Sequence, residues 1–302
     1  MLDAMEMPVR PGGAATLAVG IDIGGTAAKL ALVDGDGAVL ASDRLPTGRA
    51  MAGETLVVQL AARVRALCDG RRIAGIGIGV PATVTAGRPI DPTYCNVPAL
   101  AGLDICGALS AALGVPAWLE NDAKAALRAE WRFGAAKDAR NAAIVTLGTG
   151  IGSALLLDGR IRDGAHGNHG ELGLVMVGPP DALQPLEQRA SPGFIAERHG
   201  ATLPELLAAA RGGDRAAAEV IDRAFGYLGT AIANLHLLLD LEVVVLAGAA
   251  TGMGAELVER VTAAFTAACP KIYRFGLDIR LARLGGLAGA VGAAALAQMS
   301  AA

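Results

Sequence analysis

Cysteine and aromatic residues are scarce in this chain. Of its 302 residues, 3% are aromatic and four are cysteines, at Cys68, Cys95, Cys106 and Cys269. The cysteines are scattered and form no C-x-x-C pair, so neither a disulfide framework nor a cysteine zinc site is expected. A reduced, cytoplasmic setting follows from this usage.

Excess positive charge and long apolar runs are also lacking. The net charge is −3, which does not favour a nucleic-acid or anionic-membrane surface, so the expected partner is a small molecule. The most apolar region, residues 231–250, is interrupted by Asn234, His236, Asp240 and Glu242, whereas a membrane span needs about 20 apolar residues. Residues 1–16 show no signal-peptide pattern. The 53% hydrophobic content is ample for the cores of two lobes.

One early stretch, residues 19–29, combines an apolar strand with a glycine turn and polar residues. The glycines permit positive φ and bring backbone N–H groups close to an anion, while a hydroxyl and an ammonium add further donors. A carboxylate at the strand end could orient a magnesium ion through water. The residues that would carry this phosphate chemistry are Asp22, Gly24, Gly25, Thr26 and Lys29. An ordinary glycine hairpin is the alternative, since glycine motifs alone are weak signals.

The same plan recurs in the second half. Residues 141–147 read as a buried strand, Gly148-Thr-Gly-Ile-Gly152 as a turn, and residues 153–157 as a returning strand. Two such turns far apart in the chain indicate that its halves share a plan, each presenting a hairpin to one ligand. This coincidence strengthens the prediction of phosphate binding.

A third polar cluster follows the short strand predicted at residues 115–119. There Glu120, Asn121 and Asp122 precede a helix predicted at residues 123–131. Polar residues at the carboxyl end of a strand are where open α/β sheets bind ligands. Asn121 and Asp122 could also be plain helix caps. In the strand predicted at residues 73–80, repeated glycines indicate either close packing or a ligand lying over the chain.

The remaining elements follow from periodicity and turn residues. Residues 160–191 read as a loop in which glycines frame His166, Asn168, His169 and Glu171. A small hairpin is predicted at residues 83–92 and strands at 38–45, 242–247 and 277–282. Helices are predicted at 54–68, 103–113, 192–199, 203–211, 215–239, 252–268 and 288–298.

With these pieces in order, the chain resembles the ROK family of sugar kinases along nearly its whole length. The matching motifs are Asp22-x-Gly-Gly-Thr26, Gly77-Ile-Gly-Val-Pro81, Glu120-Asn-Asp-Ala123, Leu147-Gly-Thr-Gly-x-Gly152, Gly170-Glu-x-Gly173, Leu186-Glu-x-x-x-Ser191 and Leu246-Ala-Gly248. The resemblance implies an α/β, two-lobed actin-like ATPase (ribonuclease H-like) fold with a cleft. It implies a sugar and phosphate lobe at residues 14–120, completed by the C-terminal helix at 288–302. Residues 121–287 would form the nucleotide-binding and dimerisation lobe.

The resemblance also implies roles for individual residues. Asp122 corresponds to the catalytic base and contacts the sugar, with Asn121, Asn96, Glu171 and Glu187 as further ligands of sugar hydroxyls. ATP with magnesium is the implied donor, with adenosine near Gly248 and a homodimer as the expected assembly. The phosphates would lie between the two hairpins. The second hairpin would contribute Thr146, Gly148, Thr149 and Gly150.

Three departures from the family pattern bear on the substrate. The family's zinc motif is absent, because Leu174 stands where a histidine is usual and residues 177–185 contain no cysteine. No structural zinc is therefore expected. The missing histidine normally also touches the sugar, and His169 and His166 are candidates to replace it. Residues 81 and 82 are Pro-Ala instead of Pro-Gly. The position of Lys29 and the run at residues 150–155 are similar to the zinc-free polyphosphate glucokinases of the family.

The expected function is therefore an ATP- and magnesium-dependent kinase that phosphorylates the primary hydroxyl of a hexose. Glucose is the default, and an amino sugar or a cyclitol is an alternative. Polyphosphate is the alternative donor, although the acidic balance favours ATP. The rival from another class is a sugar-binding regulator of the same family. Only about 16 residues precede the first strand, too few for a three-helix DNA-binding domain. A degenerate sugar-binding paralogue is disfavoured by the intact Asp122 and hairpins.

Overall fold

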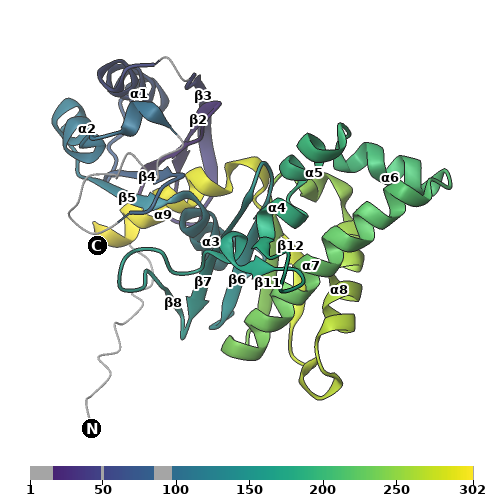
Figure 1. Cartoon of the computed structure of the whole chain (residues 1–302). Coiled ribbons are helices and arrows are strands. Elements are labelled where there is room, and N and C mark those ends of the chain that lie inside the picture. The colour runs from purple at the N-terminus through teal and green to yellow at the C-terminus, as the bar shows by residue number, and fades with distance from the viewer. Residues whose placement is uncertain (1–15, 49–50, 85–96, 302) are drawn as a thin grey trace, which may run out of the picture.

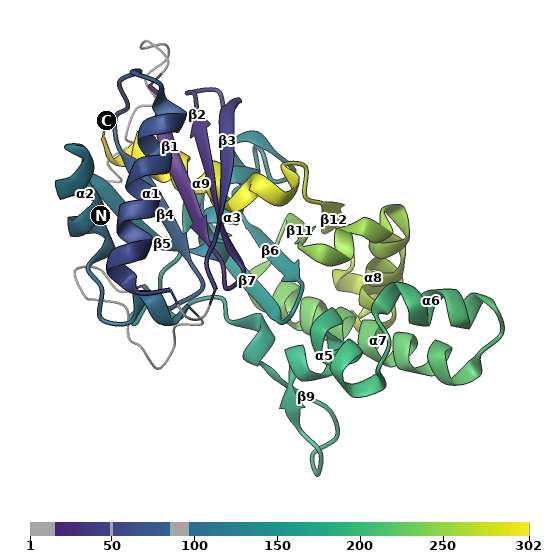
Figure 2. The same ribbon diagram turned by 90° about the horizontal axis from the view of Figure 1, so that it is seen from above.

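The computed structural model describes residues 16–48, 51–84 and 97–301. Asn96 and most of the hairpin predicted at 83–92 lie outside the described residues. Within them, two five-stranded sheets dominate, joined by helices that lie between and outside them (Figures 1 and 2).

The first sheet has the strand order β3-β2-β1-β4-β5. β1 pairs antiparallel with β2, which pairs antiparallel with β3, whereas β4 is parallel to both β1 and β5. Its outer face is covered by α1 and α2 (Figure 2). The bounds are β1 Ala18–Ile23, β2 Ala27–Val33, β3 Val39–Pro46, α1 Gly53–Cys68, β4 Ile76–Val80, η1 Pro98–Leu100, α2 Ile105–Leu113 and β5 Ala117–Asn121.

The second sheet repeats this plan in the order β12-β11-β6-β7-β8. β6, β7 and β8 form an antiparallel meander, and β11 runs parallel to β6 and β12. The prediction that the two halves share a plan is confirmed, down to the glycine hairpin between the first two strands of each sheet. The bounds are β6 Ala142–Leu147, β7 Ile151–Leu157, β8 Arg160–Ile161, β11 Val243–Ala247 and β12 Asp278–Leu281.

Helices α3 (Asp122–Phe133) and α9 (Ala288–Ser300) pack against each other between the two sheets (Figure 2). α9 also packs on β1 and β4, so the end of the chain returns to the first sheet. The outer face of the second sheet is covered by a helical group built on α7. Its members are α5 Pro192–His199, α6 Leu203–Arg211, α7 Arg215–Leu239, η3 Ala249–Met253 and α8 Ala255–Ala268, and η4 Lys271–Tyr273 and η5 Gly285–Leu287 follow.

The glycines of β1 and β4 serve close packing. A Cβ added at Gly77 would lie 1.7 Å from the Ala293 carbonyl oxygen of α9, and one at Gly20 would lie 1.7 Å from the Ala290 carbonyl oxygen. Real Cβ atoms cannot approach backbone so closely, so α9 can sit on this sheet only where side chains are missing. The alternative of close packing therefore holds for Gly77, while the part of the segment that lines a cavity begins at Pro81.

Several predicted boundaries were wrong. The loop expected at 160–191 contains β8, η2 (Leu172–Leu174), β9 (Met176–Val177), β10 (Gln184–Pro185) and the helix α4 (Leu186–Ala190). These elements are too short to show a periodic pattern, and α4 is held by packing of its fully buried Leu186 and of Ala190 in the core around α7. The helix expected from residue 252 begins as α-helix only at Ala255, because Gly254 has a φ of +62°. No helix in the described part of the chain is both long and apolar enough to cross a bilayer.

Candidate active site

The main cavity of the predicted site, of about 630 Å³, opens where the two halves of the molecule meet. Its wall is formed by the segment after β4, the junction of β5 and α3, the β6–β7 hairpin, the region around η2 and α4. The lining residues are Pro81, Ala82, Thr83, Asn121, Asp122, Ala123, Thr146, Gly148, Thr149, Gly150, Ile151, Gly152, Ser153, Asn168, Glu171, Leu174, Glu187 and Gly248. The cavity therefore brings together most of the substrate and phosphate residues predicted from the second half of the chain.

Asn121 and Asp122 stand at the carboxyl end of β5, where α3 begins. The Asn121 side-chain oxygen accepts hydrogen bonds from the backbone N–H groups of Ala123, at 3.0 Å, and Lys124, at 3.2 Å. Its amide nitrogen donates to the Ala82 carbonyl oxygen at 3.3 Å. Asn121 is thus the N-cap of α3, and Asp122 is the first helical residue. The sequence allowed both residues to be helix caps, and in the structure only Asn121 is one.

The carboxyl group of Asp122 has a strongly perturbed pKa. This pKa is raised from 3.8 to about 7, first by burial and then by the negative charges of Asp22 and Glu171. A hydrogen bond of 2.7 Å from the Ala123 N–H to Asp122 Oδ1 acts in the opposite direction. A carboxyl group poised near neutrality in a cavity wall is suited to proton transfer.

Glu171 and Glu187 meet on the facing wall. Burial raises the pKa of Glu171; the charge of Lys124 opposes this shift and that of Glu187 adds to it. Glu187 Oε2 accepts a hydrogen bond of 3.4 Å from the Ile151 N–H. A Cβ on Gly150 would lie 2.5 Å from the same oxygen, so a larger residue there would displace this carboxylate. Glu187 therefore lies at the second hairpin as well as in the cavity.

The β6–β7 hairpin is a tight and well-braced turn. The Gly148 N–H donates to the Gly150 carbonyl oxygen at 3.0 Å, and Thr146 Oγ1 accepts from the Gly152 N–H at 3.1 Å. Ser191 Oγ donates to the Thr149 carbonyl oxygen at 3.0 Å. Such bracing holds backbone groups of the turn in fixed directions before any ligand arrives.

A second cavity, of about 720 Å³, adjoins the first at Gly148 and Thr149. It is lined by residues of α5, α6, η3 and α8, with an Arg211–Glu256 ion pair among them. Gly248, predicted to lie near adenosine, lines the first cavity and immediately precedes η3. The β6–β7 hairpin thus forms a wall common to two cavities.

The β1–β2 hairpin lies less directly on these cavities. Its turn is closed by a 3.1 Å bond from the Gly24 N–H to the Ala27 carbonyl oxygen, and Thr47 Oγ1 donates to the Gly24 carbonyl oxygen at 2.7 Å. Lys29 Nζ donates to the Gly286 carbonyl oxygen at 2.8 Å. Neither cavity lining includes Gly24, Gly25, Thr26 or Lys29. Their phosphate role stays a prediction.

Asp22, from the same hairpin, does reach the site electrostatically. Its charge raises the pKa of Asp122, and burial raises its own pKa against the opposing charge of Lys29. Two carboxylates that repel each other in this way offer hard oxygen donors. Magnesium commonly uses one or two protein carboxylates together with substrate phosphates, so Asp22 would suit a magnesium ion held by phosphates beside Asp122.

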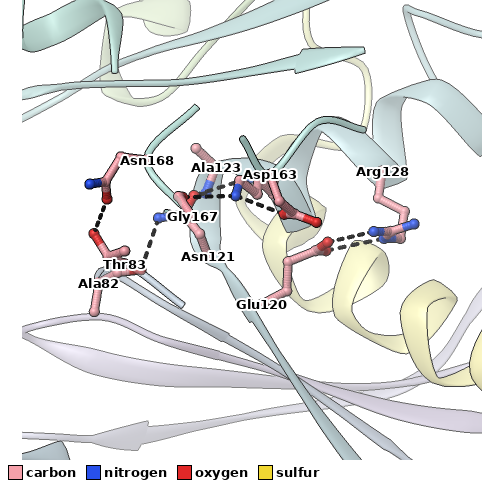
Figure 3. Close-up of polar contacts among 10 residues, drawn as sticks. Ala82, Thr83, Glu120, Asn121, Ala123, Arg128, Asp163, Gly167 and Asn168 are labelled. Atoms are coloured by element: carbon pink, nitrogen blue, oxygen red, sulfur yellow. Dashed lines mark hydrogen bonds and ion pairs between the residues drawn. The ribbon is translucent and has the colours of Figure 1, made fainter. Parts of the chain in front are cut away.

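Three polar contacts near the site had no signal in the sequence (Figure 3). Thr83 Oγ1 donates to Asn168 Oδ1 at 2.8 Å, which links the two halves across the cavity. Arg128 and Glu120 form a buried two-pronged ion pair, one arm of which, Nε to Oε2, measures 3.1 Å. Lys124 makes the third contact, to the side chain of Asp163 and the carbonyl oxygen of Gly167. The contacts of Thr83 and Lys124 join residues 85 and 39 positions apart, which a local pattern cannot bring together.

His169 and Leu174 are the residues on which the substrate question depends. His169 is not part of the cavity lining, its pKa is lowered by burial, and its Nδ1 atom is buried without a hydrogen-bond partner among the described residues. Leu174 lines the cavity and is 56% exposed. The sugar-binding role of His169 stays a prediction.

No group of three or more His, Cys, Asp or Glu side chains within the described ranges could hold a metal ion. The described cysteines, Cys68, Cys106 and Cys269, are free thiols. The absence of structural zinc stays a prediction.

Comparison with known proteins gives consistent matches over the whole fold. The model of the ROK family matches residues 18–300. A glucokinase of Halalkalibacterium halodurans is 28% identical, over 91% of this chain and 92% of its own length. An N-acetylmannosamine kinase of Yersinia pestis is 30% identical, over 84% of this chain and 89% of its own. The crystal structure of a ROK family glucokinase from Streptomyces griseus, in complex with glucose and AMPPNP, has a TM-score of 0.79 at 27% identity, covering 94% and 99% of the two chains.

Proposed function

Because the chain belongs to the ROK family and is a sugar kinase of the actin-like ATPase fold, we propose that it phosphorylates the primary hydroxyl of a hexose with ATP. Asp122 is the proposed general base. One observation carries this proposal: a carboxyl group with a pKa of about 7 lies in the wall of a cavity that also holds two further carboxylates and a glycine hairpin.

The two adjoining cavities support separate binding sites for the sugar and the nucleotide. The first contains hydroxyl-binding groups, namely Asn121, Glu171 and Glu187. Carboxylates and amides can accept from or donate to neighbouring hydroxyl groups with defined geometry. The second cavity, beyond Gly148 and Thr149, offers apolar walls for a nucleoside. The hairpin between them is then the natural place for the transferred phosphoryl group.

Asp122 accepts the proton of the attacking hydroxyl in this mechanism. Its pKa of about 7 means that a large fraction is ionised at neutral pH while the group remains basic enough to take up a proton. The rest of the site acts by positioning. Phosphoryl transfer needs little covalent help from a protein, and it depends mainly on alignment and charge neutralisation.

Magnesium is the proposed metal, held by the nucleotide phosphates and oriented through water by Asp22, which leaves Asp122 free as the base. When bound, it neutralises charge that develops on the phosphoryl oxygens. Burial raises the pKa of Asp22, and the charge of Asp22 adds to the raised pKa of Asp122, so a divalent cation at this position would stabilise both carboxylates.

Glucose is the proposed default acceptor, and the relatives named glucokinase support it. An amino sugar is the alternative supported by the N-acetylmannosamine kinase relative, and a cyclitol is the third acceptor to be tested. ATP is the proposed donor, because the carboxylates around Asp122 disfavour a long polyanion such as polyphosphate. A cytoplasmic location and a homodimeric assembly are further parts of the proposal.

A coupled phosphorylation screen tests this proposal. Glucose, mannose, glucosamine, N-acetylglucosamine, N-acetylmannosamine and myo-inositol are each supplied with ATP or with polyphosphate, with and without magnesium. Turnover of a hexose with ATP and magnesium is the expected result. Turnover with polyphosphate but not with ATP would overturn the proposal that ATP is the donor. Sugar binding without turnover under any condition would favour the non-catalytic regulator.

A further inference from the structure

Lys124 is a buried lysine two residues beyond the proposed base. Only 4% of its side chain is exposed, and it is not part of the cavity lining. Its ammonium group donates to Asp163 Oδ1 at 2.9 Å and to the Gly167 carbonyl oxygen at 3.0 Å. Burying a charge is unfavourable unless it is paired and hydrogen-bonded, so both contacts matter. Each partner belongs to one loop, residues 162–171, which runs over the start of α3 (Figure 3).

This loop is intrinsically hard to order. Gly164, Gly167 and Gly170 all have positive φ, at +70°, +80° and +94°. Glycine loses more conformational freedom on folding than any other residue, so a loop with three such bends needs tethers to keep one shape. One tether is internal, a 3.3 Å bond from the His169 N–H to the Asp163 carbonyl oxygen. It closes the loop on itself but does not fix it to the site.

The loop also delivers side chains to the site. Asn168 and Glu171 both line the main cavity. Glu171 is anchored from its own side, because Ser153 Oγ contacts the Gly170 carbonyl oxygen and accepts from the Leu172 N–H at 2.9 Å. Asn168 lies farther from this anchor than Glu171 does. It directly follows Gly167, whose carbonyl oxygen accepts a hydrogen bond from Lys124. A movement of Gly167 would therefore displace Asn168 before Glu171, and it would strain the 2.8 Å hydrogen bond that Asn168 accepts from Thr83.

We propose that Lys124 is a positioning residue of the sugar site, which ties residues 163–168 to the first turn of α3 and so places Asn168 and Glu171 opposite Asp122. α3 is the natural anchor because it begins with Asn121 and Asp122, so one helix sets both walls of the cavity. The inference rests on the proposed function only in taking a sugar as the ligand of this cavity.

The charge of Lys124 has a second effect on the same wall. It lowers the pKa of Glu171, against burial and the negative charge of Glu187, which both raise it. The charge of Glu171 in turn raises the pKa of Asp122. Removal of the ammonium should therefore leave Glu171 protonated to a higher pH, and binding that needs its carboxylate should weaken as the pH is lowered.

The test uses two substitutions and a matched control. Lys124→Met keeps the length of the side chain but removes its charge and donors. Asp163→Asn removes one charge of the pair, and Asp158→Asn makes the same change in a comparable pair on the same segment. The Asp163 and Asp158 side chains are 72% and 73% exposed, and each accepts an ion-pair contact of 2.9 Å. Asp158 pairs with Arg162, away from the loop tip.

The expected result is a selective loss of sugar affinity. Lys124→Met should raise the sugar KM by about tenfold or more, because hydrogen bonds to a charged group are lost. Asp163→Asn should raise it severalfold, and Asp158→Asn should leave it within about twofold. The KM for ATP should stay near the parent value throughout. In Lys124→Met the sugar KM should also rise more steeply than in the parent as the pH is lowered, a change that simple loosening would not produce. Lys124→Arg, which keeps the charge, should recover part of the loss.

Hydrogen–deuterium exchange of the peptide covering residues 162–171 separates this inference from the proposed function. Faster exchange in Lys124→Met, together with weaker glucose binding by calorimetry, supports the tether even if the parent phosphorylates none of the sugars. A folded Lys124→Met protein with the parent's sugar KM and glucose affinity overturns it. If Lys124→Met fails to fold, equal sugar KM values for Asp163→Asn and Asp158→Asn overturn it instead.

Discussion

Replacement of Asp122 by asparagine separates a catalytic carboxylate from a structural one. Asparagine is nearly isosteric and can still bind a hydroxyl, but it cannot accept a proton. A general base contributes about 10²- to 10⁴-fold to rate, so kcat should fall by at least about 10²-fold while the sugar KM changes far less. The α3 N-terminus should survive, because its cap is the side chain of Asn121.

The same substitution has a calculable effect on stability. In the folded protein the pKa of Asp122 is about 7, against an ordinary value of 3.8. Between these pH values the folded state holds a proton that the unfolded state has lost, so stability falls as pH rises through this window. The difference corresponds to at most about 4 kcal/mol above pH 7, and to less where the carboxylate still meets water in the cavity. Asp122→Asn removes this penalty.

The assay is therefore a pair of measurements on one purified variant. Steady-state kinetics should show the loss of kcat, and the parent's kcat/KM should rise with pH through about 7 while that of the variant should not. Urea unfolding should show the variant more stable than the parent at pH 8 and nearly equal at pH 4. Asp214→Asn is the matched control, because Asp214 is an exposed N-cap of α7 that asparagine can replace. A folded Asp122→Asn protein with kcat within about tenfold of the parent would refute the assignment.

Three further predictions follow from the fold and the site. Gly77→Ala should destabilise the protein by about 1–3 kcal/mol or more, because its Cβ would clash with α9. Gly226→Ala, on an open face of α7, is the control and should stabilise the protein by about 0.4–1 kcal/mol. Equal thermal midpoints for the two variants would contradict this prediction. Protein purified without added metal should contain no stoichiometric zinc by elemental analysis, and activity lost on chelation should return with magnesium alone. Small-angle scattering should show compaction with hexose and nucleotide together, as the halves linked by Thr83 and Asn168 close over substrate; an unchanged profile would argue against closure.

Much of the architecture could be predicted because its signals are local. The helices expected at 192–199, 203–211 and 215–239 match α5, α6 and α7 to the residue, since each combines a helical apolar period with glycine or a cap at its ends. The repeated strand–hairpin–strand plan was equally visible, and the two sheets have the same order. Asp122 was accessible to the same reasoning, because its motif places it at the carboxyl end of a strand.

What could not be predicted depends on contacts between distant segments. α4 has five residues, and only the core around α7 makes its helical state stable. The approach of Glu187 to Gly150 joins residues 37 positions apart, and the pairing of Thr83 with Asn168 joins residues 85 apart. Nothing in the sequence sets Lys124 apart from other helical residues. Only the folded loop reveals that its charge is buried, and no periodicity in the sequence encodes that loop.

The site is organised at the expense of the stability of the empty protein. Burial raises the pKa values of Asp22, Asp122 and Glu171, which means that ionisation of each carboxyl group lowers the stability of the folded protein. The positive charges of two lysines oppose these shifts: Lys29 lowers the pKa of Asp22, and Lys124 lowers the pKa of Glu171. Neither lysine lines the cavity. A cation bound there would therefore be the group that relieves the repulsion of Asp122 by Asp22 and Glu171. Ligands that bind only the folded state raise its stability. Magnesium with nucleotide should therefore stabilise this protein more at pH 8 than at pH 5, where Asp122, with a pKa of about 7, is largely protonated.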